Sequence, residues 1–194
     1  QNVDKPLRAQ YNMGRYGEYT MSISENVTHY LKQIAGGNCF GEKVTLVAAT
    51  KTRTAEEINE AIRAGITDIG ENKVQEFRDK FDLITGGNRQ FIGHLPTNKI
   101  KYLIGKPYLI HALDRDELMT ELAARSVRAG VTTDVLIEVN IGSELSKSGY
   151  SLREAFAAYE RAQSTAGLRV RGFMAMLPLS GDEQLLGGLA DEMR

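Results

Sequence analysis

Between residues 22 and 177, short apolar segments alternate with amphipathic segments of helical period. Each apolar segment has the length of a β-strand, and the six cover residues 44–50, 67–72, 89–94, 108–114, 134–141 and 169–177. The fifth, DVLIEVNI, is almost continuously apolar, as is typical of a parallel strand that is buried on both faces. The alternation therefore predicts an α/β protein in which right-handed helical crossovers join the strands of a parallel sheet.

The amphipathic segments carry start and stop signals for helices. Four begin with a capping box, in which Ser, Thr or Asp precedes Glu by three residues, and each ends near a glycine. These boxes are Ser22 with Glu25, Thr54 with Glu57, Asp114 with Glu117, and Ser151 with Glu154. In the last of these helices, we expect the apolar face to contain Leu152, Ala155, Phe156 and Tyr159.

Two architectures fit this alternation: an open doubly wound sheet and a (β/α)8 TIM barrel. No G-x-G-x-x-G or Walker A segment follows any predicted strand, which argues against an open sheet that binds nucleotides. A barrel needs eight strands and about 250 residues, whereas six strands are visible here. After Pro178 we expect only a loop and part of a helix. The barrel hypothesis therefore requires that the last two strands lie outside these residues.

Composition and charge narrow the function classes. With 194 residues and 42% hydrophobic residues, the chain is expected to form one domain over residues 21–194, preceded by a loose leader at 1–20. The net charge of −1 gives no electrostatic reason to expect nucleic acid or an anionic membrane as a partner. Cys39 is the single cysteine, and no His or Cys spacing suggests a metal site. We expect a cytoplasmic protein that is a monomer.

Polar residues follow the predicted strands at their carboxyl ends, the edge at which barrel proteins place their active sites. Lys51, Asn72 and His94 follow the first three strands, so a barrel would bring an amine, an amide and an imidazole to one rim. A lysine at a partly apolar rim has a lowered pKa, because burial disfavours the ammonium form. The neutral amine forms Schiff bases with aldehydes, and pyridoxal phosphate is the usual aldehyde partner of such a lysine.

The residues alone also allow simpler interpretations. A lysine at a strand end is usually solvated, which applies to Lys51, and Lys147 lies in the polar segment SELSKSG. Asn72 and Asp114 precede helices and can cap them, while His94 can hydrogen-bond within its own loop. Composition and spacing therefore support only an α/β protein with a candidate pocket at its strand ends.

Six segments carry a resemblance to a known family. They are LVAATKTRT, DIGENKVQE, FIGHLPTNK, IHALD, LIEVNIGSELSKSG and RGFMAMLP, which run in this order from about Val44 to Pro178. In order and spacing, they resemble the pyridoxal-phosphate homeostasis proteins. The commoner form of the third segment has Gln where Pro96 stands.

The resemblance implies a barrel similar to the N-terminal domain of alanine racemase. It implies that Lys51 holds pyridoxal 5′-phosphate as a Schiff base, that Asn72, His94 and Met174 line the cofactor ring, and that Lys147 lies in the SKSG loop of the site. Proteins of this family look like carriers or regulators of pyridoxal phosphate, with amino acids as further small-molecule partners, and not like enzymes. No metal and no catalytic residue are implied.

Two alternatives to this function stay open. The first is an amino-acid racemase-like enzyme, although a two-base racemase needs a second acid or base on the far face of the cofactor, usually from another domain or subunit. The second is a barrel-like fragment that serves only in interactions. In addition, the family places the cofactor phosphate after its seventh strand and an arginine after its eighth, and neither has a counterpart before Arg194. We therefore expect this chain to hold pyridoxal phosphate weakly or not at all.

Overall fold

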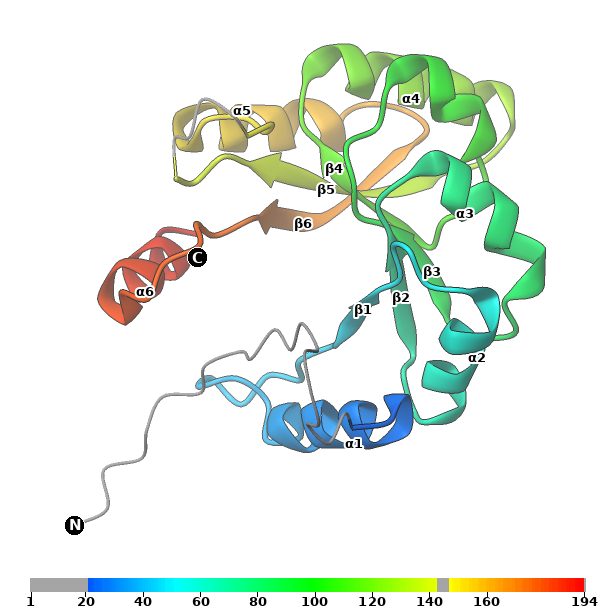
Figure 1. Ribbon diagram of the computed structural model, residues 1–194. Coiled ribbons are helices and arrows are strands. Elements are labelled where there is room, and N and C mark those ends of the chain that lie inside the picture. Colours follow the sequence, from blue (N-terminus) through cyan, green and yellow to red (C-terminus); the bar gives the residue numbers. More distant parts are fainter. Residues whose placement is uncertain (1–20, 143–146, 194) are drawn as a thin grey trace.

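The computed structural model describes residues 21–142 and 147–193, so the expected leader at 1–20 lies outside the described residues. Its centre is one six-stranded parallel sheet in which the strands follow one another in chain order (Figure 1). The strands are β1 (Val47–Ala49), β2 (Asp68–Glu71), β3 (Asn88–Phe91), β4 (Leu109–Leu113), β5 (Thr133–Val139) and β6 (Leu168–Ala175).

Helices connect successive strands, as the alternation predicts. They are α2 (Ala55–Arg63), α3 (Val74–Lys80) with the 3-10 turn η1 (Phe81–Leu83), η2 (Thr97–Tyr102), α4 (Asp116–Arg128) and α5 (Leu152–Gln163), while α1 (Ile23–Ile34) precedes β1 and α6 (Glu183–Glu192) follows β6. Three of the expected capping boxes are present, at the starts of α1, α2 and α5. The fourth is wrong, because α4 begins after Arg115 and has no side-chain cap. The carboxylate of Asp114 is engaged elsewhere.

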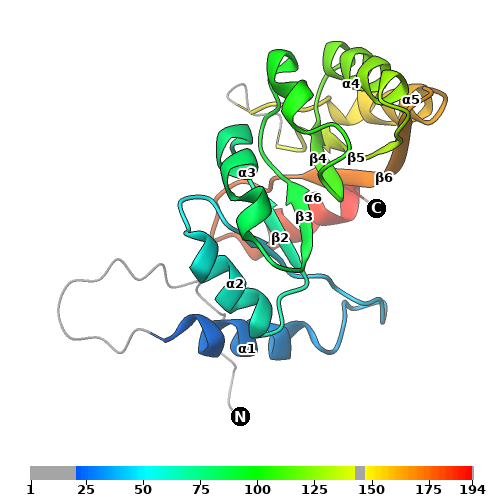
Figure 2. The same cartoon turned by 90° about the vertical axis from the view of Figure 1, so that its right-hand side faces the viewer.

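The strand order decides between the two architectures. A doubly wound sheet reverses direction near its middle, as in the order 3-2-1-4-5-6, but here each strand is added to the same side of the preceding one. Right-handed crossovers in one direction place their helices on one face of the sheet. In Figures 1 and 2, α1 to α5 follow the convex side of a strongly curved sheet. The open-sheet alternative is therefore excluded, and the units are arranged as in a (β/α)8 barrel.

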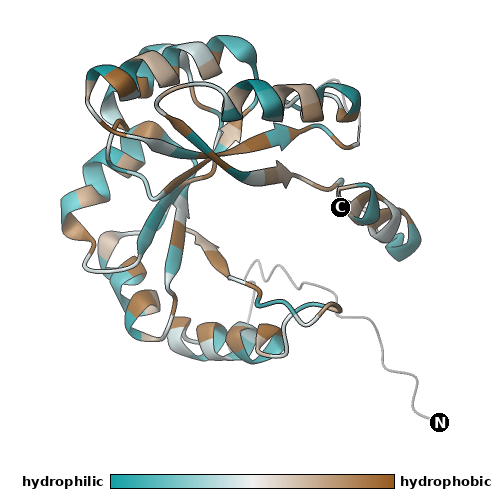
Figure 3. Cartoon of the chain, turned by 180° about the vertical axis from the view of Figure 1, so that it is seen from behind, coloured by the Kyte–Doolittle hydropathy of each residue, from teal (hydrophilic) through white to brown (hydrophobic). Residues whose placement is uncertain are grey.

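Buried apolar residues join the sheet to its outer helices, and hydrophobic positions are brown along the ribbon in Figure 3. A large cluster joins β3–β6 to α3, α4 and α5, and a smaller one joins α1 and α2 to β2. Fully buried members of the large cluster include Phe91, Leu113, Leu122 and Ile137, each 0% exposed. None of the helices within residues 21–142 and 147–193 combines the length and apolar character that crossing a membrane requires.

The first strand departs from expectation. The predicted strand covers residues 44–50, but β1 is limited to Val47–Ala49 and Val44 is 37% exposed. Within the described residues, β1 has a hydrogen-bonded neighbour on one side, β2. A strand with one neighbour leaves half of its backbone groups without sheet partners. The apolar run of residues 44–49 therefore forms a short edge strand and not one that is buried on both faces.

Candidate functional site

A cleft of about 200 Å³ lies at the carboxyl ends of β2, β3, β5 and β6. This volume suits a single small ring, because an engineered cavity of about 150 Å³ accommodates benzene. The walls combine aliphatic and thioether surface with amide, imidazole, carboxyl and amine groups. The lining residues are Asn72, Ile92, Gly93, His94, Glu138, Val139, Asn140, Lys147, Ser148, Met174 and Met176.

The ends of β2 and β3 approach each other closely at Gly93. A Cβ atom on Gly93 would lie 2.1 Å from the carbonyl oxygen of Asn72, so only glycine fits here. The close approach places the side chains of Asn72 and His94 beside each other in the cleft. The amide oxygen Oδ1 of Asn72 is buried and has no hydrogen-bond partner. An acceptor of this kind is the group that a bound ligand can satisfy.

His94 is oriented by a carboxylate at the end of the neighbouring strand. Its Nδ1 lies 2.9 Å from Oδ2 of Asp114, whose side chain is 2% exposed. Arg115 donates to the other oxygen of Asp114 and also to the carbonyl oxygen of Leu95, 3.0 Å away. Asp114 is therefore a buried acceptor for two cationic or polar side chains, which is why it does not cap α4. Because Nδ1 of His94 pairs with Asp114, Nε2 is the ring nitrogen that can contact a ligand in the cleft.

Glu138 contributes a half-buried carboxyl group to the concave side of β5. Its neighbours Val135 and Ile137 belong to the core under the helices, and side chains alternate along a strand, so Glu138 faces the opposite side. Burial raises the pKa of Glu138, the nearby charge of Asp114 raises it further, and His94 partly offsets the rise. The cleft thus contains a carboxyl group that is easier to protonate than an exposed one.

The segment after β5 turns back onto the strand and brings Lys147 and Ser148 to the cleft. Tyr150 donates its N–H to the carbonyl oxygen of Glu138, and Asn140 donates its N–H to the carbonyl oxygen of Tyr150, both at 2.9 Å. Gly149 makes this return possible: its φ is +115°, and a Cβ would lie 2.8 Å from the Asn140 nitrogen.

Met174 of β6 and Met176, just after the end of β6, form another wall of the cleft. The register between β5 and β6 shifts after Val135, which pairs with Val170, because Leu136 pairs with Gly172. The extra residue is a β-bulge, and bulges redirect the side chains that follow them. Met174 is half-buried in the cleft, and Met176 is 60% exposed. A carbonyl oxygen on the same wall, that of Met176, lies 3.4 Å from Nζ of Lys147.

Lys51 is exposed and does not line the cleft. The expectation that an apolar rim buries this amine is therefore wrong. Within the described residues, β1 ends at Ala49 and has a strand on one side, β2, so the Lys51 side chain stays accessible. Its backbone nevertheless lies beside the cleft. Ala49 pairs with Gly70, and β1 and β2 are parallel, so the turn with Lys51 and the residue Asn72 follow the carboxyl ends of two adjacent strands, which lie about 4.8 Å apart.

The structure thus brings together four of the five residues singled out in the sequence: Asn72, His94, Lys147 and Met174. Sequence reasoning missed Glu138, although a charged residue inside the apolar run LIEVNI is a recognisable signal. Ser148, which adjoins Lys147, was also missed. Among the residues that the structure describes, no group of three or more His, Cys, Asp or Glu side chains could hold a metal ion.

A family model and individual relatives agree on the family of this chain. The alanine racemase N-terminal domain family matches residues 22–189. The chain is 39% identical over 168 residues to the pyridoxal phosphate homeostasis protein of Aquifex aeolicus, a match that covers 81% of this chain and 72% of that protein. It is 38% identical over 140 residues to the protein of the same name from Escherichia coli K12, covering 70% of this chain and 60% of that one.

Solved structures show the same fold. An unknown protein from Bifidobacterium adolescentis superimposes with a TM-score of 0.81 and 29% identity, over 89% of this chain and 76% of that one. PipY of Synechococcus elongatus, solved with PLP bound, has a TM-score of 0.68 at 19% identity, over 88% and 83% of the two chains. Alanine racemase from E. faecalis has a TM-score of 0.70 at 13% identity, over 88% and 46%.

Proposed function

Because this chain belongs to the alanine racemase N-terminal domain family, and within it to the pyridoxal phosphate homeostasis proteins, we propose that it binds pyridoxal 5′-phosphate and serves in its homeostasis. The observation that carries the proposal is the cleft itself. It assembles Asn72, His94, Lys147 and Met174 from four separate segments, and these are the residues that the resemblance assigns to the cofactor.

The residues of the cleft fit this cofactor chemically. Asn72 offers a buried acceptor without a partner, and Lys147 contributes a cation that suits anionic oxygens. Met174 and Met176 provide polarizable thioether surface, which packs favourably against aromatic rings. When bound, pyridoxal phosphate supplies an aldehyde that condenses with a neutral amine and releases water. The donors, the acceptor and the thioethers would hold the ring in place for that condensation.

We propose Lys51 as the amine that bonds to the cofactor. Its turn follows the carboxyl end of β1, and β1 pairs in parallel with β2, whose end leads into Asn72 of the cleft. A lysine side chain has four rotatable carbons and can reach across one strand spacing, about 4.8 Å, to the cleft. Lys147 is the other amine of the site, and the SKSG segment that carries it is part of the cleft wall. The position of the covalent bond is therefore the first point to test.

The proposed role is that of a carrier without turnover. The relatives are named for homeostasis and not for a reaction. We propose further that the protein acts in the cytoplasm and as a monomer, which light scattering of the purified protein would test. Multiple turnovers in a racemisation assay with amino acids would overturn the carrier role in favour of a racemase-like enzyme.

The experiment that tests the proposal is borohydride reduction after addition of pyridoxal phosphate, followed by peptide mass mapping. Because the sequence leads us to expect weak binding, pyridoxal phosphate is added in excess; we then expect yellow absorbance and one pyridoxyl adduct, on Lys51. Lys51→Ala should abolish both, whereas Lys43→Ala, at an exposed lysine preceding β1, should change neither. An adduct mapped to a different lysine would overturn the assignment of Lys51. Complete absence of absorbance and adduct would overturn pyridoxal phosphate binding.

A further inference from the structure

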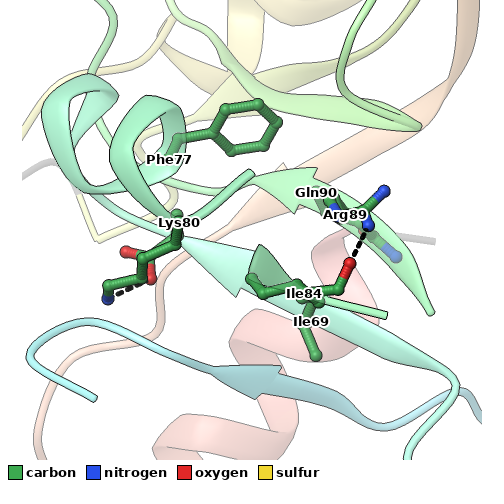
Figure 4. A pocket seen from close by; sticks show the side chains of 7 residues that line it. Ile69, Phe77, Lys80, Ile84, Arg89 and Gln90 are labelled. Carbon is green, nitrogen blue, oxygen red and sulfur yellow. Dashed lines mark hydrogen bonds and ion pairs between the residues drawn. The ribbon is translucent and has the colours of Figure 1, made fainter. Parts of the chain in front are cut away.

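A network of charged groups holds the turn that contains Lys51. At its centre is Lys80, the last residue of α3, which reaches down to the sheet beside a small cavity (Figure 4). Its ammonium nitrogen lies 2.8 Å from Oε1 of Glu71, 2.9 Å from Oε2 of Glu76 and 3.1 Å from the carbonyl oxygen of Thr50. An ammonium group has three N–H donors, so each proton of Lys80 has one acceptor.

The network contacts the chain on both sides of Lys51. On the amino side, Thr50 is held by its carbonyl oxygen, which accepts from Lys80, and by its hydroxyl, which donates to Glu71 at 2.8 Å. On the carboxyl side, Thr52 donates its N–H to Oε2 of Glu76 at 2.9 Å. Lys51 itself is exposed. The backbone around it is therefore fixed while its side chain is left accessible.

The backbone that the network holds is strained. Thr52 has a φ of +64°, and it is the single residue other than glycine with a positive φ in residues 21–142 and 147–193. A β-branched residue rarely adopts this conformation, and such strain persists only where the surroundings enforce it. Strained backbone of this kind clusters at functional sites. Two hydrogen bonds hold this conformation: Arg53 donates its N–H to the carbonyl oxygen of Thr50 at 3.1 Å and closes the turn, and Thr52 donates its N–H to Glu76.

Burial and charge keep the network intact. The side chains of Glu71, Lys80 and Glu76 are 4%, 15% and 21% exposed. Burial alone would lower the pKa of Lys80, but its hydrogen bonds and charge pairing with Glu71 and Glu76 outweigh burial and raise the pKa. Lys80 therefore stays a cation and does not compete with Lys51 as a nucleophilic amine.

We propose that Glu71, Glu76 and Lys80 form a clamp that fixes the Lys51 turn, so that the Lys51 amine is presented to the cleft. The three residues are positioning residues, since none of them lines the cleft. This inference rests on the proposed function, because it assigns the clamp a purpose in pyridoxal phosphate capture. It adds that α3, which contributes no side chain to the cleft, controls how well Lys51 reacts.

The test begins with Glu76→Ala, which removes the acceptor of Thr52 and leaves the buried pair of Lys80 and Glu71. Two quantities are measured: amide hydrogen exchange at Thr52 without cofactor, and the rate of borohydride-trapped adduct formation at each lysine with pyridoxal phosphate. Hydrogen bonds to charged groups are the strong ones. We therefore expect Thr52 exchange to accelerate about tenfold or more, and adduct formation at Lys51 to slow by a similar factor.

Two further variants separate positioning from general destabilisation. Lys73→Met is the matched control, because Lys73 is 71% exposed and pairs at 3.8 Å with the other oxygen of Glu76; it should leave both quantities at the wild-type level. Thr52→Gly in the Glu76→Ala background should restore Lys51 adduct formation in part, since glycine adopts a positive φ without strain. Lys80→Met should slow adduct formation at Lys51 more than Glu76→Ala does.

The outcomes distinguish the two proposals. Unchanged Thr52 exchange or an unchanged Lys51 adduct rate in Glu76→Ala would overturn the clamp, as would an equal loss in Lys73→Met. Slower adduct formation at all lysines alike would also overturn it. If wild-type protein forms no adduct at any lysine, the proposed function fails, and Thr52 exchange still decides whether the clamp holds the turn.

Discussion

Gly93 sets the distance between two strands that form the cleft. Its missing side chain lets the end of β3 pass beside Asn72, whose carbonyl oxygen would lie 2.1 Å from a Cβ. Asn72 and His94 owe their proximity to this contact. The cleft therefore depends on one backbone approach as much as on the polar side chains that line it.

Replacing Gly93 by alanine should force the two strand ends apart. Overpacking of this kind costs about 1–3 kcal/mol, so we expect the free energy of unfolding in urea to fall by that amount and pyridoxal phosphate binding to weaken. Gly181→Ala is the control, because a Cβ there meets nothing within 4 Å. Equal unfolding curves for Gly93→Ala and the control would contradict the role of the close approach.

Glu138 should make stability depend on pH. Its folded-state pKa lies above the ordinary value of 4.5, first because of burial and then because of the charge of Asp114. The folded state therefore favours the protonated carboxyl, and stability is lost as pH rises through the folded pKa. Glu138→Gln carries no charge, so it should be more stable than wild type at pH 7, and the difference should shrink towards pH 4.

Thermal unfolding at the two pH values measures this effect. Glu160→Gln, at an exposed position of α5, controls for the loss of one negative charge and should show little change at either pH. A Glu138→Gln variant that is less stable than wild type at pH 7 would show that the carboxylate is stabilised in the fold. A difference of the same size at pH 4 and pH 7 would exclude titration as its cause.

At the scale of elements, the return of the chain after β5 builds one wall of the cleft. Gly149 combines a positive φ with a Cβ position 2.8 Å from the Asn140 nitrogen. Gly149→Ala should detach the segment that carries Lys147 and Ser148, because detachment relieves about 1–3 kcal/mol of strain. We expect weaker pyridoxal phosphate binding and faster amide exchange at Tyr150, with a smaller change in global stability.

A second glycine controls for backbone conformation. Gly130, after α4, also has a positive φ of +68°, but a Cβ there would meet nothing within 4 Å. Gly130→Ala should cost stability and leave the cleft unchanged. If both variants weaken binding alike, the effect of Gly149→Ala comes from general strain and not from the wall of the cleft.

The elements show what sequence can predict here. Strand ends, three capping boxes and the meeting of Asn72 and His94 depend on local patterns and on the parallel order of strands, so they could be predicted. The places of Lys147 and Met174 in the cleft were expected from the family resemblance alone. Other features, such as which face of α5 is buried, depend on tertiary contacts. Phe156 is 65% exposed and Leu152 45% exposed, because α5 packs through a face of small residues, which are Ala155, Ala158 and Ala162.

Asp114 shows the same limit at the site. Its sequence position suits an N-cap, but its carboxylate pairs with His94 across the gap between two strands. A contact between residues twenty positions apart leaves no trace in local sequence. The exposure of Lys51 was also beyond prediction, because it depends on how many strands lie beside β1.

For the whole molecule, the division into two apolar clusters has consequences for the site. The smaller cluster, with Val27, Ile58 and Ile69 among its members, supports β1 and the Lys51 turn, whereas the larger one supports β3 to β6. β1 pairs with β2 at three positions and β5 with β6 at seven. Small units with few contacts open more readily than the core of a domain.

We therefore expect the region around β1 to exchange its amide protons faster than β5 does. Ile58→Ala, at a side chain 2% exposed in the smaller cluster, should cost about 2–5 kcal/mol and speed exchange in β1 and α2 while β5 stays protected. Leu122→Ala, at a side chain 0% exposed in the larger cluster, should speed exchange in both regions. Equal acceleration of β1 and β5 by Ile58→Ala would show that the molecule opens as one unit. If β1 opens alone, Lys51 is withdrawn from Asn72 and His94 while the rest of the cleft remains folded, so cofactor capture would follow the stability of the smaller cluster.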